Sequence, residues 1–373
     1  MSTASPNKFA CIGHPADVEQ FRGIVNTLRT ERNLADKSFD KRLLIKLFEW
    51  TPAFKIKDIN PVGFSGSGSV EGIVVIAPFL PEMRDIKLKE IGDKIEDAIV
   101  IAAQEGCTVA ALGGFTSIIL QGREEDLSKK HGIKLTSGNT LTAAVIVRSI
   151  ERITTRFGID LAKSTMAIVG ASGDIGSGCT GYFCDKVQRL LLTARGRGKL
   201  EEVAEKYRAQ ATCELELFSS EENKQAISRA DIVIFVTSAY KGIITLREFE
   251  PYTIVCDASS PLNVRINSPL RPDVFIFHGG VLALPFEIDT GQDLGLPSTY
   301  TFYGCQVEGI LMALYPQLPC SWGRGNINRE KLHQYLSILD SVEGMRTAFT
   351  IAHHTYHESE IDTYVKKWEK KAF

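Results

Sequence analysis

The sequence predicts an α/β protein with a Rossmann-type parallel sheet at its centre. Short apolar runs rich in β-branched residues alternate with amphipathic helical patterns, as in parallel sheets whose strands are buried on both faces. The glycine-rich segment 170–176 follows one of these runs directly and is itself followed by a helical pattern. A strand, a glycine-rich turn and a helix in this order are typical of a dinucleotide-binding domain.

Six elements are predicted in the first 160 residues. They are strands at 9–12, 72–76 and 108–112 and helices at 17–30, 88–104 and 139–157. The run Ser65-Gly66-Ser67-Gly68-Ser69 lies between apolar segments. Its composition predicts a hairpin-type loop rather than a linker between domains.

The central segment, 164–280, has the clearest parallel-sheet pattern. Its predicted strands are 165–169, 189–193, 231–237, 253–257 and 274–278, with a helix at 200–208 between two of them. Beyond residue 280 we expect a helix at 301–314, stopped by Pro316, and a helical tail at 329–373. The expected domains are an N-terminal α/β substrate domain (1–160), a Rossmann domain (161–290) and a C-terminal helical region (291–373).

Composition and charge exclude several classes of protein. Of the 373 residues 44% are hydrophobic and 24% charged, which is ordinary for a soluble enzyme. The net charge of −2 leaves no broad basic field for nucleic acid. No apolar run approaches the roughly 20 residues of a membrane helix, and the N-terminus lacks the apolar core of a signal peptide. We therefore expect a cytoplasmic protein that binds no nucleic acid and has no membrane span.

The eight cysteines are scattered and form no Cys-x-x-Cys pair. Their spacings fit no zinc site, so we expect no bound metal. Most of them should be buried, reduced thiols, with at most one or two chemically active.

The glycine turn has the features that bind a pyrophosphate through backbone amides. Gly170 begins the turn, Gly173 lets the backbone approach the phosphates, and Gly176 lets the next helix pack against the strand. At the end of the second strand, where an NAD enzyme places a carboxylate, the sequence reads Thr193-Ala194-Arg195. An arginine can pair with a 2′-phosphate, so NADPH is favoured. The expected cofactor-binding residues are Gly170, Ser172, Gly173, Asp174, Ile175, Gly176, Thr193, Ala194, Arg195, Thr237 and Ser238.

Two residues are candidates for the catalytic chemistry. Cys305 follows Gly304 near the start of a predicted helix, where helix N-termini lower thiol pKa values and supply donors to an oxyanion. That effect would be small if the helix began as early as Ser298. His278 ends a predicted strand beside Gly279-Gly280 and could donate a proton, although a histidine bonded to nearby backbone is the more common outcome. Glu82 follows an apolar strand, where a structural role is as well supported as a catalytic one.

Several segments resemble the long-chain fatty acyl-[acyl carrier protein] reductases of cyanobacteria, in order and in spacing. The resemblance extends from about Phe9 to about Leu339. The segments are Phe79-Leu80-Pro81-Glu82-Met83, Ala111-Leu112-Gly113-Gly114-Phe115-Thr116-Ser117-Ile118-Ile119, Ser137-Gly138-Asn139-Thr140, Val169–Ser177, Leu192-Thr193-Ala194-Arg195 and Ser321-Trp322-Gly323-Arg324.

This resemblance implies an NADPH-dependent reduction of a fatty acyl thioester to a fatty aldehyde. In that family a cysteine in a Phe-Ala-Cys-x-x-Glu-Ala context takes the acyl group as a thioester, and Tyr303-Gly304-Cys305-Gln306-Val307-Glu308-Gly309 occupies the matching place. The implied partners are a fatty acyl thioester on acyl carrier protein or coenzyme A, and the resemblance also leaves room for an aldehyde-consuming enzyme. The shared segments give the expected substrate-binding residues Phe79, Glu82, Phe115, Thr116, Ser117 and Asn139.

The chain also departs from that family. Residues 29–69 are longer and have little resemblance, His278 replaces an expected asparagine, 290–301 differs, and the extension beyond about Ala352 has no recognised counterpart. Two other functions stay open. One is an NADP-dependent dehydrogenase of a small alcohol or ketone, resembling the shikimate dehydrogenases, and the other is a non-catalytic NADPH-binding scaffold.

Overall fold

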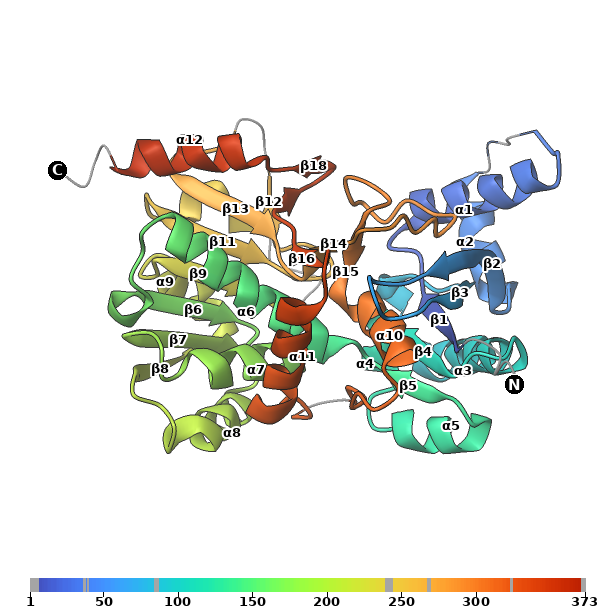
Figure 1. Cartoon of the computed structure of the whole chain (residues 1–373), viewed down its shortest axis with the longest axis horizontal. Helices are drawn as coiled ribbons and strands as arrows, with labels where there is room; N and C mark the ends of the chain where they lie inside the picture. Colours follow the sequence, from blue (N-terminus) through green and yellow to red (C-terminus); the bar gives the residue numbers. More distant parts are fainter. Residues whose placement is uncertain are drawn as a thin grey trace. The chain divides into compact units, whose positions relative to one another are not determined.

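The computed structural model describes residues 7–35, 38, 40–83, 87–238, 244–266, 270–322 and 325–369. The chain forms two compact units, each assembled from segments distant in sequence (Figure 1). Unit 1 consists of Met1–Asn139, Ala283–Gly323 and Val342–Met345, and unit 2 of Thr140–Leu282, Arg324–Ser341 and Arg346–Phe373. The three-part division at residues 160 and 290 stays a prediction.

Unit 1 contains a five-stranded sheet in the order β2-β3-β1-β4-β5. The strands are β1 (Lys8–Gly13), β2 (Phe54–Val62), β3 (Val70–Ile76), β4 (Val109–Leu112) and β5 (Lys134–Thr136). All neighbours are parallel except β2 and β3, which form an antiparallel pair joined by residues 63–69. The hairpin-type loop predicted from the glycine and serine run is therefore confirmed.

Helices cover both faces of this sheet. Ile91, Ile95 and Ile99 of α3 (Leu88–Gln104) share a core cluster with alternate residues of β1 and β4, such as Ala110 and Leu112. Successive residues of a strand point to opposite faces. Helix α10 (Gly304–Leu314) meets the other face, where Gly309 packs directly against Ala111. The remaining helices of unit 1 are α1 (Val18–Glu31), α2 (Lys41–Trp50), α4 (Phe115–Ile119) and α5 (Glu124–His131).

Unit 2 contains a six-stranded parallel sheet in the order β13-β11-β9-β6-β7-β8 (Figure 1). The strands are β6 (Thr165–Val169), β7 (Arg189–Ala194), β8 (Glu214–Ser219), β9 (Ile232–Phe235), β11 (Thr253–Asp257) and β13 (Val274–His278). Numbered along the chain, they follow the 3-2-1-4-5-6 order of the Rossmann fold, in which ligands bind where the order reverses, beside the first strand. The predicted α/β class and Rossmann-type sheet are confirmed.

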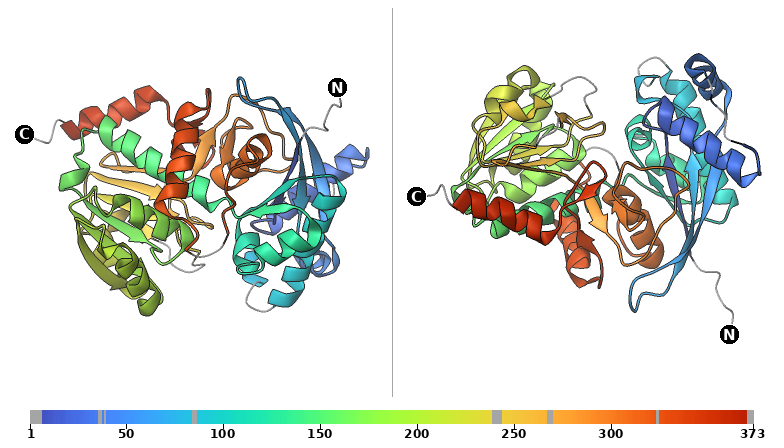
Figure 2. Two further views of the ribbon diagram at one scale, coloured as in Figure 1. Left: turned by 60° about the horizontal axis from the view of Figure 1, so that its bottom comes forward. Right: turned by 90° about the horizontal axis from the view of Figure 1, so that it is seen from above.

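The helices of unit 2 come from three parts of the chain. They are α6 (Asn139–Arg156), α7 (Asp174–Phe183), α8 (Arg197–Arg208), α9 (Asn223–Ile227), α11 (Arg329–Ser341) and α12 (Glu358–Glu369). Helices α6 and α12 lie side by side (Figure 2), where Arg156 forms an ion pair with Asp362. The short elements of the whole chain are η1 (Pro81–Met83), η2 (Leu161–Lys163), η3 (Ser220–Glu222), η4 (Leu246–Glu248), β10 (Ile244–Thr245), β12 (Val264–Arg265), β14 (Val281–Ala283), β15 (Thr301–Tyr303), β16 (Arg346–Thr347), β17 (Thr350–Ile351) and β18 (His354–Thr355).

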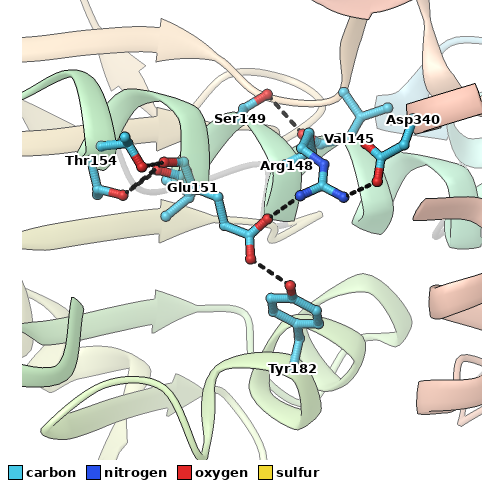
Figure 3. A network of polar contacts seen from close by, with 9 residues as sticks. Val145, Arg148, Ser149, Glu151, Thr154, Tyr182 and Asp340 are labelled. Atoms are coloured by element: carbon cyan, nitrogen blue, oxygen red, sulfur yellow. Dashed lines mark hydrogen bonds and ion pairs between the residues drawn. The ribbon is translucent and has the colours of Figure 1, made fainter. Parts of the chain in front are cut away.

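A polar network joins three helices of unit 2 (Figure 3). Arg148 of α6 donates to Glu151 of the same helix at 2.6 Å and to Asp340 of α11 at 2.5 Å. The hydroxyl of Tyr182, on α7, donates to the second oxygen of Glu151 at 2.5 Å. Because α7 begins at the glycine turn, this network anchors the helix that follows the turn to α11.

Two predicted helices differ from the structure. Residues 301–303 form strand β15, so the predicted helix begins at Gly304 instead. The predicted tail helix is interrupted by β16, β17 and β18 between α11 and α12. None of the helices in the described part of the chain combines the length and apolar content that a bilayer crossing requires.

Candidate active site

The glycine turn lies at the carboxyl end of β6, at the point where the strand order of unit 2 reverses. Gly170 has a φ of +99°, and a Cβ there would lie 2.8 Å from the Val236 carbonyl oxygen. A Cβ at Gly176 would lie 2.4 Å from the Gly170 carbonyl oxygen. Helix α7 begins at Asp174, so its first amides face the turn. The backbone is therefore as close-packed as the glycine spacing predicts, and it fits the pyrophosphate of a dinucleotide.

The end of β7 supports this turn and carries the two arginines. The carbonyl oxygen of Thr193 accepts hydrogen bonds from the amides of Gly170 and Ala171, both at 3.0 Å. Arg197 donates to Glu201 and to the Leu217 carbonyl. Arg195 is exposed and has no ion-pair partner among the described residues. Of the two arginines, Arg195 is the one available to a phosphate.

Thr237 and Ser238 follow β9, on the other side of the reversal. The Thr237 amide donates to the Ser259 hydroxyl at 3.4 Å. Ser259 belongs to the loop after β11, which Asp257 holds by accepting from the amides of Ser259 and Val264 at 3.0 and 2.8 Å. Burial raises the pKa of Asp257 to about 6. The loops after β6, β9 and β11 thus meet in unit 2, as in a dinucleotide-binding domain.

Cys305 lies in the first turn of α10, whose N-cap is Tyr303. The backbone amides of Gly114, Cys305 and Gln306 act on the thiol to lower its pKa. The helix begins at Gly304 rather than near Ser298, so Cys305 does experience the N-terminal end of the helix dipole. Its side chain is partly exposed. The helix N-terminus and these amides favour an oxyanion beside the sulfur and act in favour of the thiolate.

The net effect on the thiol differs from the sequence expectation. Burial and the nearby Glu308 raise the pKa of Cys305 to about 11, although the three amides oppose that shift. The lowered pKa expected from the helix N-terminus alone is therefore wrong for this state of the protein. The reason is desolvation, which disfavours the charged thiolate more than three amides favour it.

Two glycine turns enclose Cys305, and both follow strands of the unit 1 sheet. Gly114 follows β4 and has a φ of +61°. Gly138 follows β5 with a φ of +67°, and a Cβ there would lie 2.2 Å from the Cα of Cys305. The backbone of Gly138 therefore packs directly on the backbone of the candidate nucleophile.

Glu308 is a residue of this site that the sequence analysis did not single out. Its side chain is fully buried one turn after Cys305. It accepts a hydrogen bond from Ser321 Oγ at 2.6 Å and another from Thr136 Oγ1. The Ser137 amide in turn donates to the Ser321 carbonyl at 2.8 Å. Glu308 thus fastens α10 to the turn that carries Gly138. An acid within an otherwise apolar helix was the signal that could have identified it.

Three of the predicted substrate-binding residues, Phe115, Thr116 and Ser117, directly follow the Gly113-Gly114 turn. Thr116 is fully buried, and its hydroxyl donates to the Gly113 carbonyl at 2.7 Å. The Ser117 hydroxyl donates to the Gly114 carbonyl at 3.2 Å. Both side chains therefore hold the turn. Phe79 and Phe115 are buried, and Asn139 begins α6. The Glu82 side chain, Gly323 and Arg324 lie outside what the structure describes.

His14 is a second residue that the sequence analysis did not identify. It follows β1, and its Nε2 atom accepts a hydrogen bond from the Phe115 amide at 3.0 Å. Its ring centroid lies 4.4 Å from that of Phe79. Two segments that resemble the reductase family, one containing Phe79 and the other containing Phe115, therefore both contact the His14 imidazole.

His278 ends β13 in unit 2 and is buried. Its Nε2 atom accepts from the Ala352 amide at 3.4 Å. Burial lowers its pKa to about 4, so the ring is neutral at physiological pH. A neutral imidazole that accepts a backbone hydrogen bond is better suited to a structural role than to donating a proton. Within the described residues, no group of three His, Cys, Asp or Glu side chains is arranged to hold a metal ion.

Comparison with known proteins agrees with these features. A family model described as shikimate / quinate 5-dehydrogenase matches residues 151–278, which include the six-stranded sheet of unit 2. A long-chain acyl-[acyl-carrier-protein] reductase of Synechococcus elongatus is 29% identical over 346 residues, covering 87% of this chain and 94% of the relative. An aminotransferase named PigE, from a Serratia species, is 25% identical over 316 residues, but the match spans only 36% of its length.

Similarity to solved structures is weaker. The nucleotide-binding domain of glutamyl-tRNA reductase from Thermoplasma volcanium is 21% identical, with a TM-score of 0.27, over 36% of this chain and 84% of that one. L-tryptophan dehydrogenase from Nostoc punctiforme is 11% identical, with a TM-score of 0.34, over 70% of this chain and 66% of that one. The Synechococcus relative confirms the resemblance expected from the sequence, because this chain is similar to a long-chain acyl-[acyl-carrier-protein] reductase over most of its length. The chain is therefore an oxidoreductase with an NAD(P)-binding domain of dehydrogenase type.

Proposed function

We propose that the protein reduces a long-chain acyl thioester to a fatty aldehyde with NADPH, through a thioester on Cys305. The observation that carries this proposal is the position of Cys305 in the first turn of α10, packed against the Gly138 turn and close to backbone amides that act to lower its pKa. The Synechococcus relative supports the substrate class, because its name specifies a long-chain acyl-[acyl-carrier-protein] substrate. Acyl carrier protein is accordingly the proposed acyl donor and coenzyme A the alternative.

In the first half-reaction Cys305 takes the acyl group. The Cys305 sulfur attacks the thioester carbon, and the amides at the start of α10 and at Gly114 stabilise the tetrahedral oxyanion. The carbon–sulfur bond to the carrier then breaks, and the carrier leaves as a thiol with the proton that Cys305 gave up. Partial exposure of Cys305 lets a thioester approach it, whereas the buried Glu308 keeps the helix in place.

In the second half-reaction the acyl group leaves as an aldehyde. NADPH, when bound, supplies a hydride to the carbonyl carbon of the acyl group. Cys305 is then the leaving group, and it recovers a proton from solvent. The sum is one thioester, one NADPH and one proton giving an aldehyde, a free carrier thiol and NADP⁺. A partner enzyme that consumes the aldehyde would complete the sequence.

Replacing Cys305 tests the covalent route. The Cys305→Ser variant should bind NADPH as the wild type does but form neither an acyl-enzyme nor an aldehyde, because a serine hydroxyl at this position is a far weaker nucleophile. Mass spectrometry after mixing with an acyl thioester measures acylation, and NADPH consumption measures turnover. Cys213→Ser, a partly exposed cysteine of unit 2, is the matched control and should retain both. Full activity in Cys305→Ser would reject the mechanism.

Replacing Arg195 tests the cofactor. Arg195→Ala should weaken NADPH binding by about 10-fold to 100-fold and leave NADH binding nearly unchanged, because only NADPH carries the 2′-phosphate. Fluorescence titration with each nucleotide gives the two dissociation constants. Arg197→Ala, which removes the arginine already bonded to Glu201, is the matched control. If Arg195→Ala weakens both nucleotides equally, the assignment to NADPH fails.

A second candidate function is favoured by the match to the shikimate / quinate dehydrogenase family over residues 151–278. Such an enzyme would transfer a hydride to a small ketone directly and would need no cysteine. Iodoacetamide separates the two functions. Inactivation that an acyl thioester prevents supports the cysteine route, and activity that survives alkylation of Cys305 supports the dehydrogenase.

A further inference from the structure

The turn formed by Gly113, Gly114 and Phe115 is placed between Cys305 and His14. The turn lies beside the first turn of α10, where a Cβ at Gly113 would lie 3.9 Å from Gln306 Nε2, and its Gly114 amide acts to lower the pKa of the Cys305 thiol. Its next amide, that of Phe115, donates to His14 Nε2 at 3.0 Å. Two consecutive amides of one turn therefore interact with two different side chains, and one of these side chains is the candidate nucleophile Cys305. A contact that fixes the Phe115 amide also restricts the Gly114 amide, because the backbone atoms of Gly114 join the two.

The conformation of this turn is unusual and admits no side chain. Gly114 has φ +61° and ψ −133°, a combination that L-residues rarely adopt. A Cβ at this position would lie 2.8 Å from His14 Nε2. The imidazole therefore lies directly against the backbone of Gly114 and limits how far that residue can rotate away from Cys305.

The contacts of His14 fix both its tautomer and its orientation. Its Nδ1 atom lies 2.9 Å from the Pro15 carbonyl oxygen, which can only accept a hydrogen bond. Nδ1 is therefore the protonated nitrogen, and Nε2 has a free lone pair for the Phe115 amide. Stacking against Phe79, with ring centroids 4.4 Å apart, fixes the plane of the ring. Burial lowers the pKa of His14 to about 4, so this tautomer persists at physiological pH.

We propose that His14 is a positioning residue for Cys305. By accepting from the Phe115 amide it holds the Gly113–Phe115 turn in the conformation that aims the Gly114 amide at the sulfur. The same amide is then in place for the oxyanion that forms when Cys305 attacks a thioester. The effect on the oxyanion rests on the proposed function, whereas the effect on the thiol does not. His14 itself touches neither substrate nor cofactor in this role.

A matched pair of variants separates the hydrogen bond from mere packing. In His14→Gln the side-chain oxygen can occupy the place of Nε2 and accept from Phe115, whereas the shorter side chain of His14→Asn cannot reach it. His131→Ala is the control, because His131 is a histidine of the same unit that contacts Glu96 instead. Alkylation of Cys305 by iodoacetamide, followed by mass spectrometry as a function of pH, requires no substrate. It reports how well the amides stabilise the thiolate.

The pH profile must be interpreted with the other groups that face Cys305. Glu308 on α10 raises the pKa of the thiol. Cys11 on β1 and Tyr303 at the helix N-cap interact with it electrostatically. None of the three changes in the variants. A shift of the alkylation profile between His14→Asn and His14→Gln therefore reports on the Gly114 amide.

We expect His14→Asn to alkylate at least about 10-fold more slowly than wild type at neutral pH, with its profile displaced to higher pH, since one donor to the sulfur is misplaced. The alkylation rate of His14→Gln should stay within about threefold of the wild-type rate, and the rate of His131→Ala should equal that of wild type. Equal rates in wild type and both His14 variants would overturn the proposal, as would equal losses in both variants. Failure of the protein to reduce any thioester would sink the proposed function and leave this alkylation result valid.

Discussion

Gly138 illustrates how tightly single residues are constrained around Cys305. A Cβ at Gly138 would lie 2.2 Å from both the Cα and the carbonyl oxygen of Cys305. Gly132, in the same unit, has a similar φ of +65° but nothing within 4 Å of the place of its Cβ. The two glycines therefore separate the cost of backbone conformation from the cost of displacing Cys305.

We predict different outcomes for Gly132→Ala and Gly138→Ala. Gly132→Ala should lose about 1 kcal/mol of unfolding free energy from its positive φ and keep its acylation rate. Gly138→Ala pays the same conformational cost and must also move the Cys305 backbone, so acylation should fall by about 100-fold or more. Thermal melting and the rate of acyl-enzyme formation measure the two effects. If Gly138→Ala acylates as fast as Gly132→Ala, the packing of Gly138 on Cys305 has no role in catalysis.

The residues of the site differ in how far sequence could identify them. Gly170, Gly176 and Arg195 belong to a local pattern, in which spacing along the chain already implies the geometry. His14 and Glu308 act through contacts with residues distant in sequence, such as Phe115 and Ser321, and no local pattern predicts those. The raised pKa of Cys305 was missed because desolvation depends on tertiary packing, which the helix-terminus argument does not include.

At the scale of elements, the prediction succeeded where a single physical signal was strong. Strands β6, β11 and β13 have the predicted bounds because buried parallel strands are continuous apolar runs. Strand β8 was missed since it lies at the sheet edge and alternates Glu with Leu, so only one face is apolar. Residues 301–303 were assigned to the helix because their apolar residues continue its pattern, whereas the Tyr303 backbone is extended.

Helix α7 is held at several points along its length. Its N-terminus faces the glycine turn, and its C-terminal half carries Tyr182, whose hydroxyl donates to Glu151 (Figure 3). Close packing of Gly181 against Tyr207 of α8, where a Cβ would lie 2.5 Å from the ring, fixes the same half from another side. The turn is thus attached to a helix that is constrained along its length.

At the scale of the whole molecule, buried histidines make folding stability depend on pH. Burial lowers the pKa of His278 from 6.5 to about 4. Below pH 6.5 the unfolded chain binds a proton at this residue, and the folded chain does not until the pH approaches 4. The contribution of His278 to the unfolding free energy is therefore complete above pH 6.5 and is lost as the pH falls toward 4, by up to about 3 kcal/mol.

The His278→Asn variant should accordingly show a flatter dependence of stability on pH. Asparagine keeps a hydrogen-bond acceptor near the Ala352 amide but does not titrate, so the loss between pH 6.5 and 4 should shrink by up to about 3 kcal/mol. His14, with its pKa also lowered to about 4, leaves part of the dependence in place. Urea unfolding at a series of pH values measures how the unfolding free energy depends on pH. His353→Asn, which replaces an exposed histidine, is the control. An unchanged slope in His278→Asn would show that the residue is charged or solvated in the folded state.

The two units are interleaved along the chain, and this affects how the protein is made. Helix α10 packs on Ala111 and fastens to Thr136, yet it is encoded about 170 residues later, after the entire six-stranded sheet of unit 2. On the ribosome, where domains fold as they emerge, the unit 1 sheet must wait for one of its covering helices. The six strands of the nucleotide-binding sheet can be complete while Cys305 is still unsynthesised. If the proposed function holds, a nascent chain would acquire its capacity for the reductant before the thiol proposed to capture the acyl group has been synthesised.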